Sequence, residues 1–220
     1  MLTRVKDWLR LRTIAAAAAL RPGASRELAN YWDSQIKDPV KRRQFLDGIG
    51  NAHAPGRLQV RQHIIDRGYR TMLDAGCGPA IDFPHYRGRL DYLALDFAEV
   101  WQRAAAANRI PFVAGSIEAL PFKDRAFDVA YARAVLEHRP YYETGMRELA
   151  RVADREAIVV FFRLREDEDL IRPDVENNIH HNNYARGGVE RLARTLPGVQ
   201  RFEWLDVPGQ FHVLHLYKSS

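Results

Sequence analysis

The chain has 220 residues, 46% of them hydrophobic, and this length suits one α/β core with an appendage. Its single cysteine, Cys77, excludes an internal disulfide framework and a cysteine-rich metal site, so a cytoplasmic protein is expected. Its longest apolar run, residues 14–20, is too short to span a membrane. The net charge of +5 is uneven, because residues 1–43 carry +6 and the rest −1, so the basic excess lies outside the expected core and does not indicate a nucleic-acid-binding protein.

Residues 1–50 are predicted to form a helical N-terminal extension that caps the rest of the chain. Apolar residues at helical spacing predict a first helix that ends at Pro22, and two more helices are expected over 25–32 and 38–46. The basic, alanine-rich residues 1–20 partly imitate a secretory signal, but their interleaved arginines suit an amphipathic helix. That helix is expected either to pack on the core with its charges in solvent or to attach to a membrane surface.

Residues 51–220 are predicted to form one α/β domain. A helix around Ile64 leads into the first strand, and later helices are expected at 98–107 and 140–152. The expected strands are 71–74, 92–96, 111–114, 127–131, 158–162, 199–207 and 211–217. Strands joined by crossover helices favour a doubly wound, Rossmann-like sheet of seven mostly parallel strands. Since three residues separate the last two strands, too few for a crossover, the final strand is expected to run antiparallel.

Two glycines and an aspartate stand where the first two strands are expected to end. Gly76 and Gly78 follow the first strand, and Asp96 closes the second. Glycines here adopt dihedral angles closed to other residues and bring backbone N–H groups close to a ligand, while a carboxylate can accept both hydroxyls of a ribose. Taken singly, the glycine pair can be a tight turn and Asp96 a helix cap. Together they predict a site for an adenosine-type cofactor.

Two further segments carry a family resemblance. Residues 116–138 read Ser-Ile-Glu-Ala-Leu-Pro-Phe-Lys-Asp-Arg-Ala-Phe-Asp-Val-Ala-Tyr-Ala-Arg-Ala-Val-Leu-Glu-His, and residues 147–152 read Arg-Glu-Leu-Ala-Arg-Val. With Leu-Asp-Ala-Gly-Cys-Gly at 73–78 and the Leu-Asp pair that ends at Asp96, they resemble class I S-adenosylmethionine-dependent methyltransferases, in particular the subfamily that acts on small metabolites. The resemblance covers residues 58–218 and implies S-adenosyl-L-methionine as the cofactor.

The resemblance also implies which residues bind the cofactor. Asp74 is expected to orient the cofactor's ammonium group, and Arg133 is expected at the end of the fourth strand, beside the transferred methyl group. Ser116 replaces a usually acidic residue, so the contact with the adenine amine is expected to be weak or to come from a backbone group. The full expected set is Asp74, Gly76, Cys77, Gly78, Asp96, Phe97, Ser116, Ile117 and Arg133, with no metal ligand.

One departure from the family pattern and one further expectation concern the surroundings of this set. Pro84 and Gly88 leave room for only one or two helical turns where a full first helix normally stands. In similar enzymes a helix before the first strand folds over the cofactor pocket. Tyr31 and Trp32 are therefore expected either to exclude water from that pocket or to be ordinary packing residues.

Methyl transfer from a sulfonium requires alignment, plus removal of a proton when the acceptor is a hydroxyl. His138 and Glu137, which follow the fourth strand, are the candidate catalytic residues, and an unperturbed histidine base would make the rate rise between about pH 6 and 7. His138 can also simply close the turn after the strand. The polar segment 163–184 is expected to contact the acceptor or to be a solvated connector, and its adjacent histidines have a poor metal-ligand spacing.

The predicted function is methyl transfer to an oxygen or nitrogen atom of a small or medium-sized molecule. Alternatives are a macromolecular, lipid-linked or sugar-linked acceptor recruited by the basic N-terminus, and a cofactor-binding protein without catalysis. A nucleic-acid acceptor is disfavoured because residues 132–135 lack the Asn-Pro-Pro-Tyr type of tetrapeptide found in base N-methylases. A nicotinamide cofactor is disfavoured because no third glycine follows Gly78 at the dinucleotide spacing.

Overall fold

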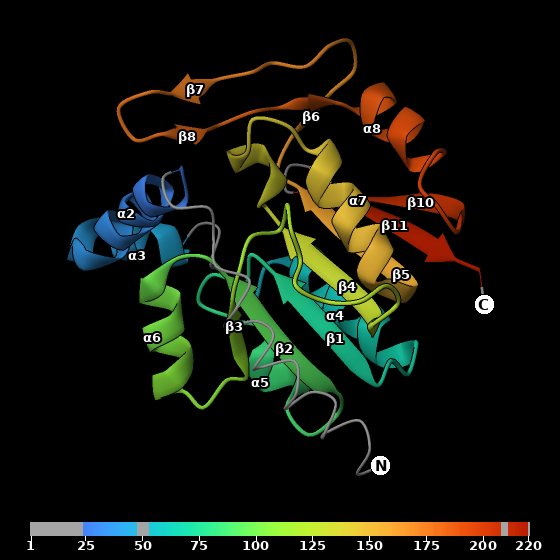
Figure 1. The fold of residues 1–220 in the computed structure, drawn as a ribbon, viewed down its shortest axis with the longest axis horizontal. Coiled ribbons are helices and arrows are strands. Elements are labelled where there is room, and N and C mark those ends of the chain that lie inside the picture. The colour runs from blue at the N-terminus through green and yellow to red at the C-terminus, as the bar shows by residue number, and fades with distance from the viewer. Residues whose placement is uncertain (1–23, 48–52, 208–210, 220) are drawn as a thin grey trace.

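The structure is a computed structural model that describes residues 24–47, 53–207 and 211–219 (Figure 1). The first predicted helix, the predicted boundary at residue 50 and the turn between the last two strands therefore lie outside the described residues. The helices are α2 (Ala24–Lys37), α3 (Pro39–Asp47), α4 (Pro55–Asp66), α5 (Phe83–Tyr86), α6 (Glu99–Ala107), the 3-10 turn η1 (Leu136–His138), α7 (Glu143–Val152) and α8 (Arg186–Ala193). The strands are β1 (Thr71–Ala75), β2 (Asp91–Asp96), β3 (Phe112–Ala114), β4 (Phe127–Arg133), β5 (Ala153–Phe161), β6 (Leu164–Arg165), β7 (Pro173–Asp174), β8 (Ile179–His180), β9 (Tyr184–Ala185), β10 (Val199–Val207) and β11 (Phe211–Lys218).

One seven-stranded sheet forms the centre of the molecule, in the order β10-β11-β5-β4-β1-β2-β3. The strands from β5 to β3 pair in parallel, and β11 runs antiparallel to both β5 and β10, which confirms the predicted topology. The fifth strand begins at Ala153, five residues earlier than expected, because α7 ends at Val152 and leads directly into it. The chain leaves β1 toward β2 on one side and returns to β4 on the other, so a topological switch point lies at the carboxyl end of β1.

Helices cover both faces of the sheet, because successive side chains of a strand point to opposite faces. In β1, Leu73 belongs to a core that includes α7 and α8, whereas Met72 belongs to a second core that includes α4 and α5. Every residue of β4 is buried, as expected for a central parallel strand. The segment with Pro84 forms one helical turn, α5, which confirms the shortened first helix.

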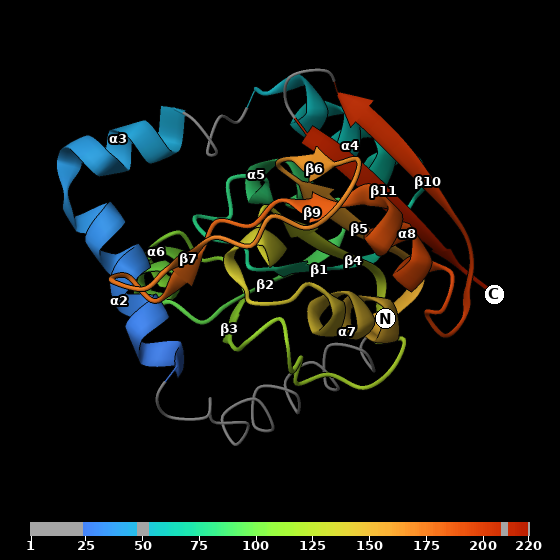
Figure 2. The same cartoon turned by 90° about the horizontal axis from the view of Figure 1, so that it is seen from above.

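Two additions lie over the carboxyl edge of the sheet. The helices α2 and α3 contact each other, and α2 contacts α6. Segment 163–184 forms an arm in which β7 and β8 pair antiparallel, and Figure 1 shows the arm above α2 with β8 nearer to the helix than β7. Seen from above, the tip of the arm overlaps α2 (Figure 2).

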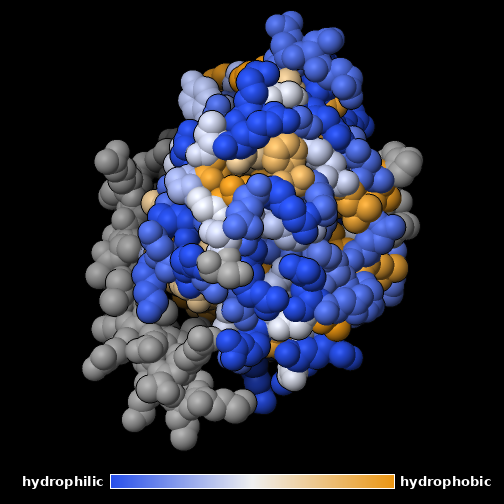
Figure 3. Space-filling model, turned by 90° about the vertical axis from the view of Figure 1, so that its right-hand side faces the viewer, coloured by the Kyte–Doolittle hydropathy of each residue, from blue (hydrophilic) through white to orange (hydrophobic). Residues whose placement is uncertain are grey.

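The face around α8, β10 and β11 is mostly hydrophilic, with small separate apolar areas (Figure 3). None of the helices within the described ranges combines the length and the hydropathy that crossing a membrane requires. The part of the fold that bears on function is the carboxyl edge of the sheet, where the cap helices and the arm lie.

Candidate active site

The glycine loop after β1 is held against the end of β2. Gly76 and Cys77 donate their backbone N–H groups to the carbonyl oxygen of Leu95 at 2.7 and 3.0 Å. Gly76 has a φ of +75° and Gly78 a φ of +52°, a region that favours glycine. A Cβ atom on Gly76 would lie 2.5 Å from Cγ2 of Val135, two residues after β4, so the backbone approaches Val135 more closely than a residue with a side chain would allow.

Asp96 connects the glycine loop to the start of α6. Its carboxylate accepts the N–H groups of Gly78 and Ala98, each at 3.0 Å, and its side chain lines the pocket described below. The residue is 6% exposed, and burial raises the pKa of its carboxyl group to about 6. The two interpretations of Asp96 are therefore compatible, since the carboxylate holds the turn before α6 and also faces the pocket.

Asp74 lies in β1 beneath the same loop. It is buried and accepts a hydrogen bond from the hydroxyl of Tyr92, and burial raises the pKa of its carboxyl group to about 7. Cys77 is a free cysteine within the loop, and burial raises the pKa of its thiol. That thiol is protonated at neutral pH and is not a nucleophile there.

Arg133 ends β4 with a buried guanidinium group. It is 8% exposed, and its three side-chain nitrogens make no hydrogen bond of ordinary geometry to the described residues. Its guanidinium carbon lies 3.8 Å from the centroid of the Phe211 ring, and burial lowers its pKa. A buried guanidinium with open donors and a place in the pocket wall is suited to bind an anion.

A second group of buried charges was not predicted from the sequence. Arg57 and Arg61, four residues apart on α4, both pair with the carboxylate of Asp82 in the loop before α5. Arg57 and Asp82 line the pocket, so this pairing fixes one end of it. The helical spacing of the two arginines was the available signal, but their partner comes from another element.

These groups surround one pocket at the carboxyl ends of β1, β2 and β4. It is lined by Trp32, Phe45, Arg57, Asp74, Gly76, Cys77, Gly78, Pro79, Ile81, Asp82, Leu95, Asp96, Phe97, Trp101, Gly115, Ser116, Ile117, Tyr131, Arg133, Ala134, Val135, His138 and Arg139. All nine residues of the expected cofactor set are among them. Of the two candidate catalytic residues, His138 lines this pocket and Glu137 lines a neighbouring one.

The cap helices close the pocket with aromatic rings. Trp32 of α2 lies 5.9 Å from Phe45 of α3 and 5.3 Å from His138, and Phe45 stacks on Trp101 of α6 at 5.9 Å, all measured between ring centroids. Asp33 accepts the backbone N–H of Val100 at 3.3 Å, which ties α2 to the start of α6. Trp32 therefore forms part of the pocket wall, whereas the neighbouring Tyr31 lines only the second pocket.

The second pocket lies between the cap and the arm and shares Trp32, Phe45 and His138 with the first. Its other lining residues are Tyr31, Gln35, Lys41, Gln44, Glu137, Phe162, Arg163, Arg172, His181, Asn182 and Asn183. Segment 163–184 thus supplies part of a pocket wall and is more than a connector. Its adjacent histidines form no metal-ligand group in the described part of the chain.

The hydrogen bonds of His138 determine its tautomer. Its Nδ1 lies 2.8 Å from the carbonyl oxygen of His180, and a carbonyl only accepts, so Nδ1 carries the proton. Nε2 is then a lone-pair acceptor, and it is buried without a hydrogen-bond partner among the described residues. Burial lowers the pKa of His138 to about 4, so the imidazole is neutral at pH 7. The rate increase between pH 6 and 7 expected for an unperturbed histidine is therefore not expected from His138 in this environment.

The pKa of Glu137 shifts in the opposite direction to that of His138. It is 3% exposed, and its Oε1 accepts the backbone N–H of Phe162 at 2.5 Å, while Oε2 is buried without a hydrogen-bond partner in the described ranges. Burial raises the pKa of its carboxyl group to about 7. Two adjacent residues that line the second pocket thus each have a buried atom without a hydrogen-bond partner in the described ranges, and burial raises the pKa of Glu137 while it lowers that of His138.

Comparisons with known proteins show similarity to methyltransferases. Residues 73–161 match a family model described as "Methyltransferase domain". The chain is 29% identical over 148 residues to a sterol 4-C-methyltransferase of Caenorhabditis elegans, covering 62% of this chain and 42% of that protein. It is 34% identical over 101 residues to a malonyl-[acyl-carrier protein] O-methyltransferase of Erwinia billingiae, covering 44% and 40%. The chain thus spans less than half the length of these curated relatives.

Solved structures share the fold over nearly the whole chain. The 1,6-didemethyltoxoflavin-N1-methyltransferase of Burkholderia thailandensis superimposes with a TM-score of 0.64 at 16% identity, covering 92% of this chain and 94% of that one. The magnesium protoporphyrin IX methyltransferase of Synechocystis, with bound S-adenosylmethionine, has a TM-score of 0.61 at 18% identity, covering 92% and 99%. The domain matched over residues 73–161, the shared fold and the pocket at the glycine loop together support a class I S-adenosylmethionine-dependent methyltransferase with S-adenosyl-L-methionine as its cofactor.

Proposed function

We propose that the chain transfers the methyl group of S-adenosyl-L-methionine to an oxygen or nitrogen atom of a small or medium-sized molecule. The observation that carries the proposal is the meeting of two pockets at His138, one built around the glycine loop and the other between the cap and the arm. A methyltransferase needs such an arrangement because the acceptor atom must face the transferred methyl group.

The pocket at the glycine loop fits the cofactor chemically. Asp96 is assigned to the ribose hydroxyls, and the open backbone at Gly78, where an added Cβ would meet only Trp101 at 4.0 Å, leaves room for a ligand. Arg133 is assigned to the carboxylate of the methionine part, because its buried donors have no hydrogen-bond partner among the described residues. Asp74 is assigned to the ammonium group. The cofactor, when bound, supplies an electrophilic methyl group on a sulfonium.

The second pocket indicates which acceptors suit this chain. Glu137 and His138 line it, and each has one buried side-chain atom, Oε2 and Nε2, without a hydrogen-bond partner among the described residues. A hydroxyl or amino group of a ligand can bond to both atoms, since Nε2 of His138 accepts and the carboxyl group of Glu137 accepts or donates with its protonation state. Lys41, Arg163 and Arg172 are exposed at its edge and carry positive charge. An acceptor with a hydroxyl or amino group at one end and an anionic group at the other matches both features.

Proton removal is assigned to the same two residues. His138 offers a neutral nitrogen lone pair in a fixed tautomer, held by the carbonyl of His180. Glu137, whose pKa is about 7, offers a carboxylate once it is ionised. Either group can accept a proton from an acceptor hydroxyl as the methyl group is transferred, and the pH dependence of the rate distinguishes them.

A macromolecular or carrier-linked acceptor remains the second candidate, supported by the basic rim of the acceptor pocket and by the acyl-carrier substrate named for one relative. Of the basic residues 1–43 that would recruit such an acceptor, residues 1–23 lie outside the described residues.

Calorimetry and a methyl-transfer assay test the proposal together. The protein is expected to bind S-adenosylmethionine and S-adenosylhomocysteine but not NAD.

Matched acceptors then test the two features of the second pocket separately: 3-hydroxybenzoate has both a hydroxyl donor and an anionic carboxylate, phenol lacks the carboxylate, and 3-methoxybenzoate lacks the hydroxyl donor. Hydroxybenzoate is expected to bind most tightly and to accept the labelled methyl group. Binding of NAD without binding of either sulfur compound would end the proposal, and preference for phenol over hydroxybenzoate would reject the anionic acceptor.

A further inference from the structure

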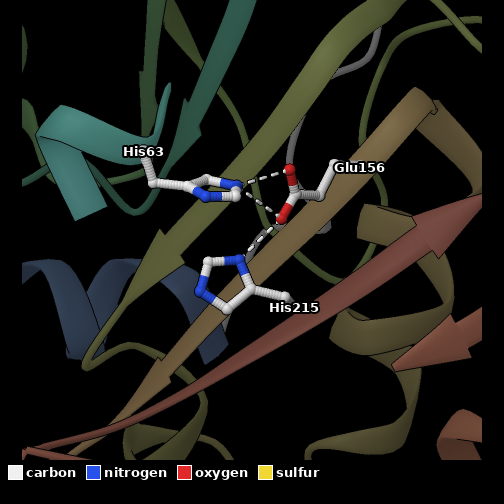
Figure 4. Close-up of side chains that lie close together, drawn as sticks. All are labelled: His63, Glu156 and His215. Atoms are coloured by element: carbon white, nitrogen blue, oxygen red, sulfur yellow. Dashed lines mark hydrogen bonds and ion pairs between the residues drawn. The ribbon is translucent and has the colours of Figure 1, made fainter. Parts of the chain in front are cut away.

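A second group of chemically active side chains lies away from the methyltransferase pockets. His63 of α4, Glu156 of β5 and His215 of β11 converge on one point, as Figure 4 shows. Nε2 of His63 lies 2.9 and 3.1 Å from the two carboxylate oxygens, and Nδ1 of His215 lies 2.6 Å from Oε1. These ligand atoms all lie within 4.8 Å of one another.

The position of Glu156 makes this group unusual. The residue is 0% exposed and stands in the first half of β5, toward the edge opposite the glycine loop. Its two carboxylate oxygens face the imidazoles of His63 and His215 and the hydroxyl of Tyr69.

Within the described ranges, the ion pairs of Glu156 are with the two histidines, and no lysine or arginine lies within ion-pair distance of it. Burying a carboxylate is unfavourable unless an opposite charge compensates it. Arg67 acts on Glu156 electrostatically from beyond ion-pair distance, whereas a cation held between the three groups would place a positive charge at the carboxylate itself.

We propose that His63, Glu156 and His215 form a binding site for one first-row divalent transition metal ion of the Zn²⁺ type. Two imidazole nitrogens and one carboxylate oxygen are a donor set that such ions favour. The Tyr69 hydroxyl donates to Oε2 of Glu156 and orients the carboxylate, as outer-shell partners of metal sites commonly do. The side chain of His63 is 25% exposed, which leaves a path from solvent for the ion and for a water ligand.

The site joins three elements that are far apart in the sequence. The helix α4 carries His63 near its end and Arg57 near its start, where Arg57 lines the cofactor pocket. A metal ion at His63 would therefore fix α4 to β5 and β11 without touching the cofactor. Its role is structural, and the expected effect is on stability and not on the methyl-transfer step.

Metal titration of the full chain after dialysis against a chelator tests the site. Calorimetry with Zn²⁺ at pH 7.5 is expected to give one ion per chain, and Co²⁺ is expected to give the visible absorption bands of a low-symmetry nitrogen and oxygen site. The melting temperature should rise with Zn²⁺ and fall back on chelation. Because protons compete with the metal ion for its ligands, the affinity should weaken as the pH is lowered.

Two variants and one control assign the ligands. Glu156→Gln keeps the shape but removes the charge, and His63→Ala removes a partly exposed ligand, so each should weaken Zn²⁺ binding at least tenfold. His85→Ala, which removes an exposed histidine of α5 outside the group, should bind as the wild type does. Absence of stoichiometric binding to the wild type, or equal affinity in His63→Ala, would overturn the proposal and leave a protonated histidine as the counter-charge.

Discussion

The close approach of Gly76 to Val135 gives a quantitative test of the glycine loop. Gly76→Ala places a methyl group 2.5 Å from Cγ2 and 2.8 Å from Cγ1 of Val135 and holds an alanine at a φ of +75°. The left-handed backbone costs roughly 1–2 kcal/mol in a non-glycine residue, and overpacking a stiff β-branched neighbour adds about 1–3 kcal/mol. The free energy of unfolding should therefore fall by about 2–5 kcal/mol, a large part of the roughly 5–15 kcal/mol typical of a folded domain.

The chain supplies a matched control for this substitution. Gly88 has a φ of +77° and no atom within 4 Å of an added Cβ, so Gly88→Ala carries the backbone cost alone. Urea denaturation of both variants isolates the steric part as their difference. The double variant Gly76→Ala with Val135→Ala should recover that part and leave the backbone cost. Calorimetry should also show weaker cofactor binding for Gly76→Ala than for Gly88→Ala. Equal losses of stability in the two single variants would refute the close-approach argument.

The other two predictions concern ionised groups. Asp96→Ala removes a carboxylate assigned to the ribose, and its charge-assisted hydrogen bonds are each worth about 1.5–3 kcal/mol, so S-adenosylhomocysteine should bind at least tenfold more weakly. The control Asp91→Ala, at the exposed start of the same strand, should bind S-adenosylhomocysteine as the wild type does. Equal affinities of the two variants would reduce Asp96 to a turn-holding role. The pH profile distinguishes the two candidate bases, because burial raises the pKa of Glu137 to about 7 and lowers that of His138 to about 4. If Glu137 is the base, kcat should rise through pH 7, and if His138 is the base, kcat should be constant above about pH 5. Glu137→Gln should abolish a rise near pH 7, whereas His138→Gln should lower kcat without shifting the pH of that rise; an unchanged profile in Glu137→Gln assigns proton removal elsewhere.

Much of this site could be predicted from local sequence patterns. Gly76, Gly78 and Asp96 stand at the ends of buried strands, and the fold brings strand ends together wherever the strands are parallel, so their proximity follows from the sequence. The antiparallel β11 followed from the three residues between the last two strands in the same way. Each of these features depends on spacing within a short stretch of chain.

Features that depend on two distant segments were not predictable in this way. The pairing of Arg57 and Arg61 with Asp82 joins α4 to the loop before α5, and no periodicity marks Asp82 as their partner. The strand containing Glu156 was expected to begin at residue 158, so a charged residue before an apolar run was left outside the sheet. The pKa of His138 also follows from burial under Trp32 and the arm, which the sequence around His138 does not encode.

The bonds around α6 link the two ends of the active site. Asp96 accepts the N–H of Ala98 just before this helix, and Asp33 of the cap accepts the N–H of Val100 and pairs with Arg103 within it. The cap helix α2 and the carboxylate assigned to the ribose are therefore both bonded to the first turns of one helix. If binding at Asp96 shifts α6, the shift reaches Trp32 on α2, and reciprocity then requires an acceptor held against Trp32 to change the cofactor affinity by the same factor.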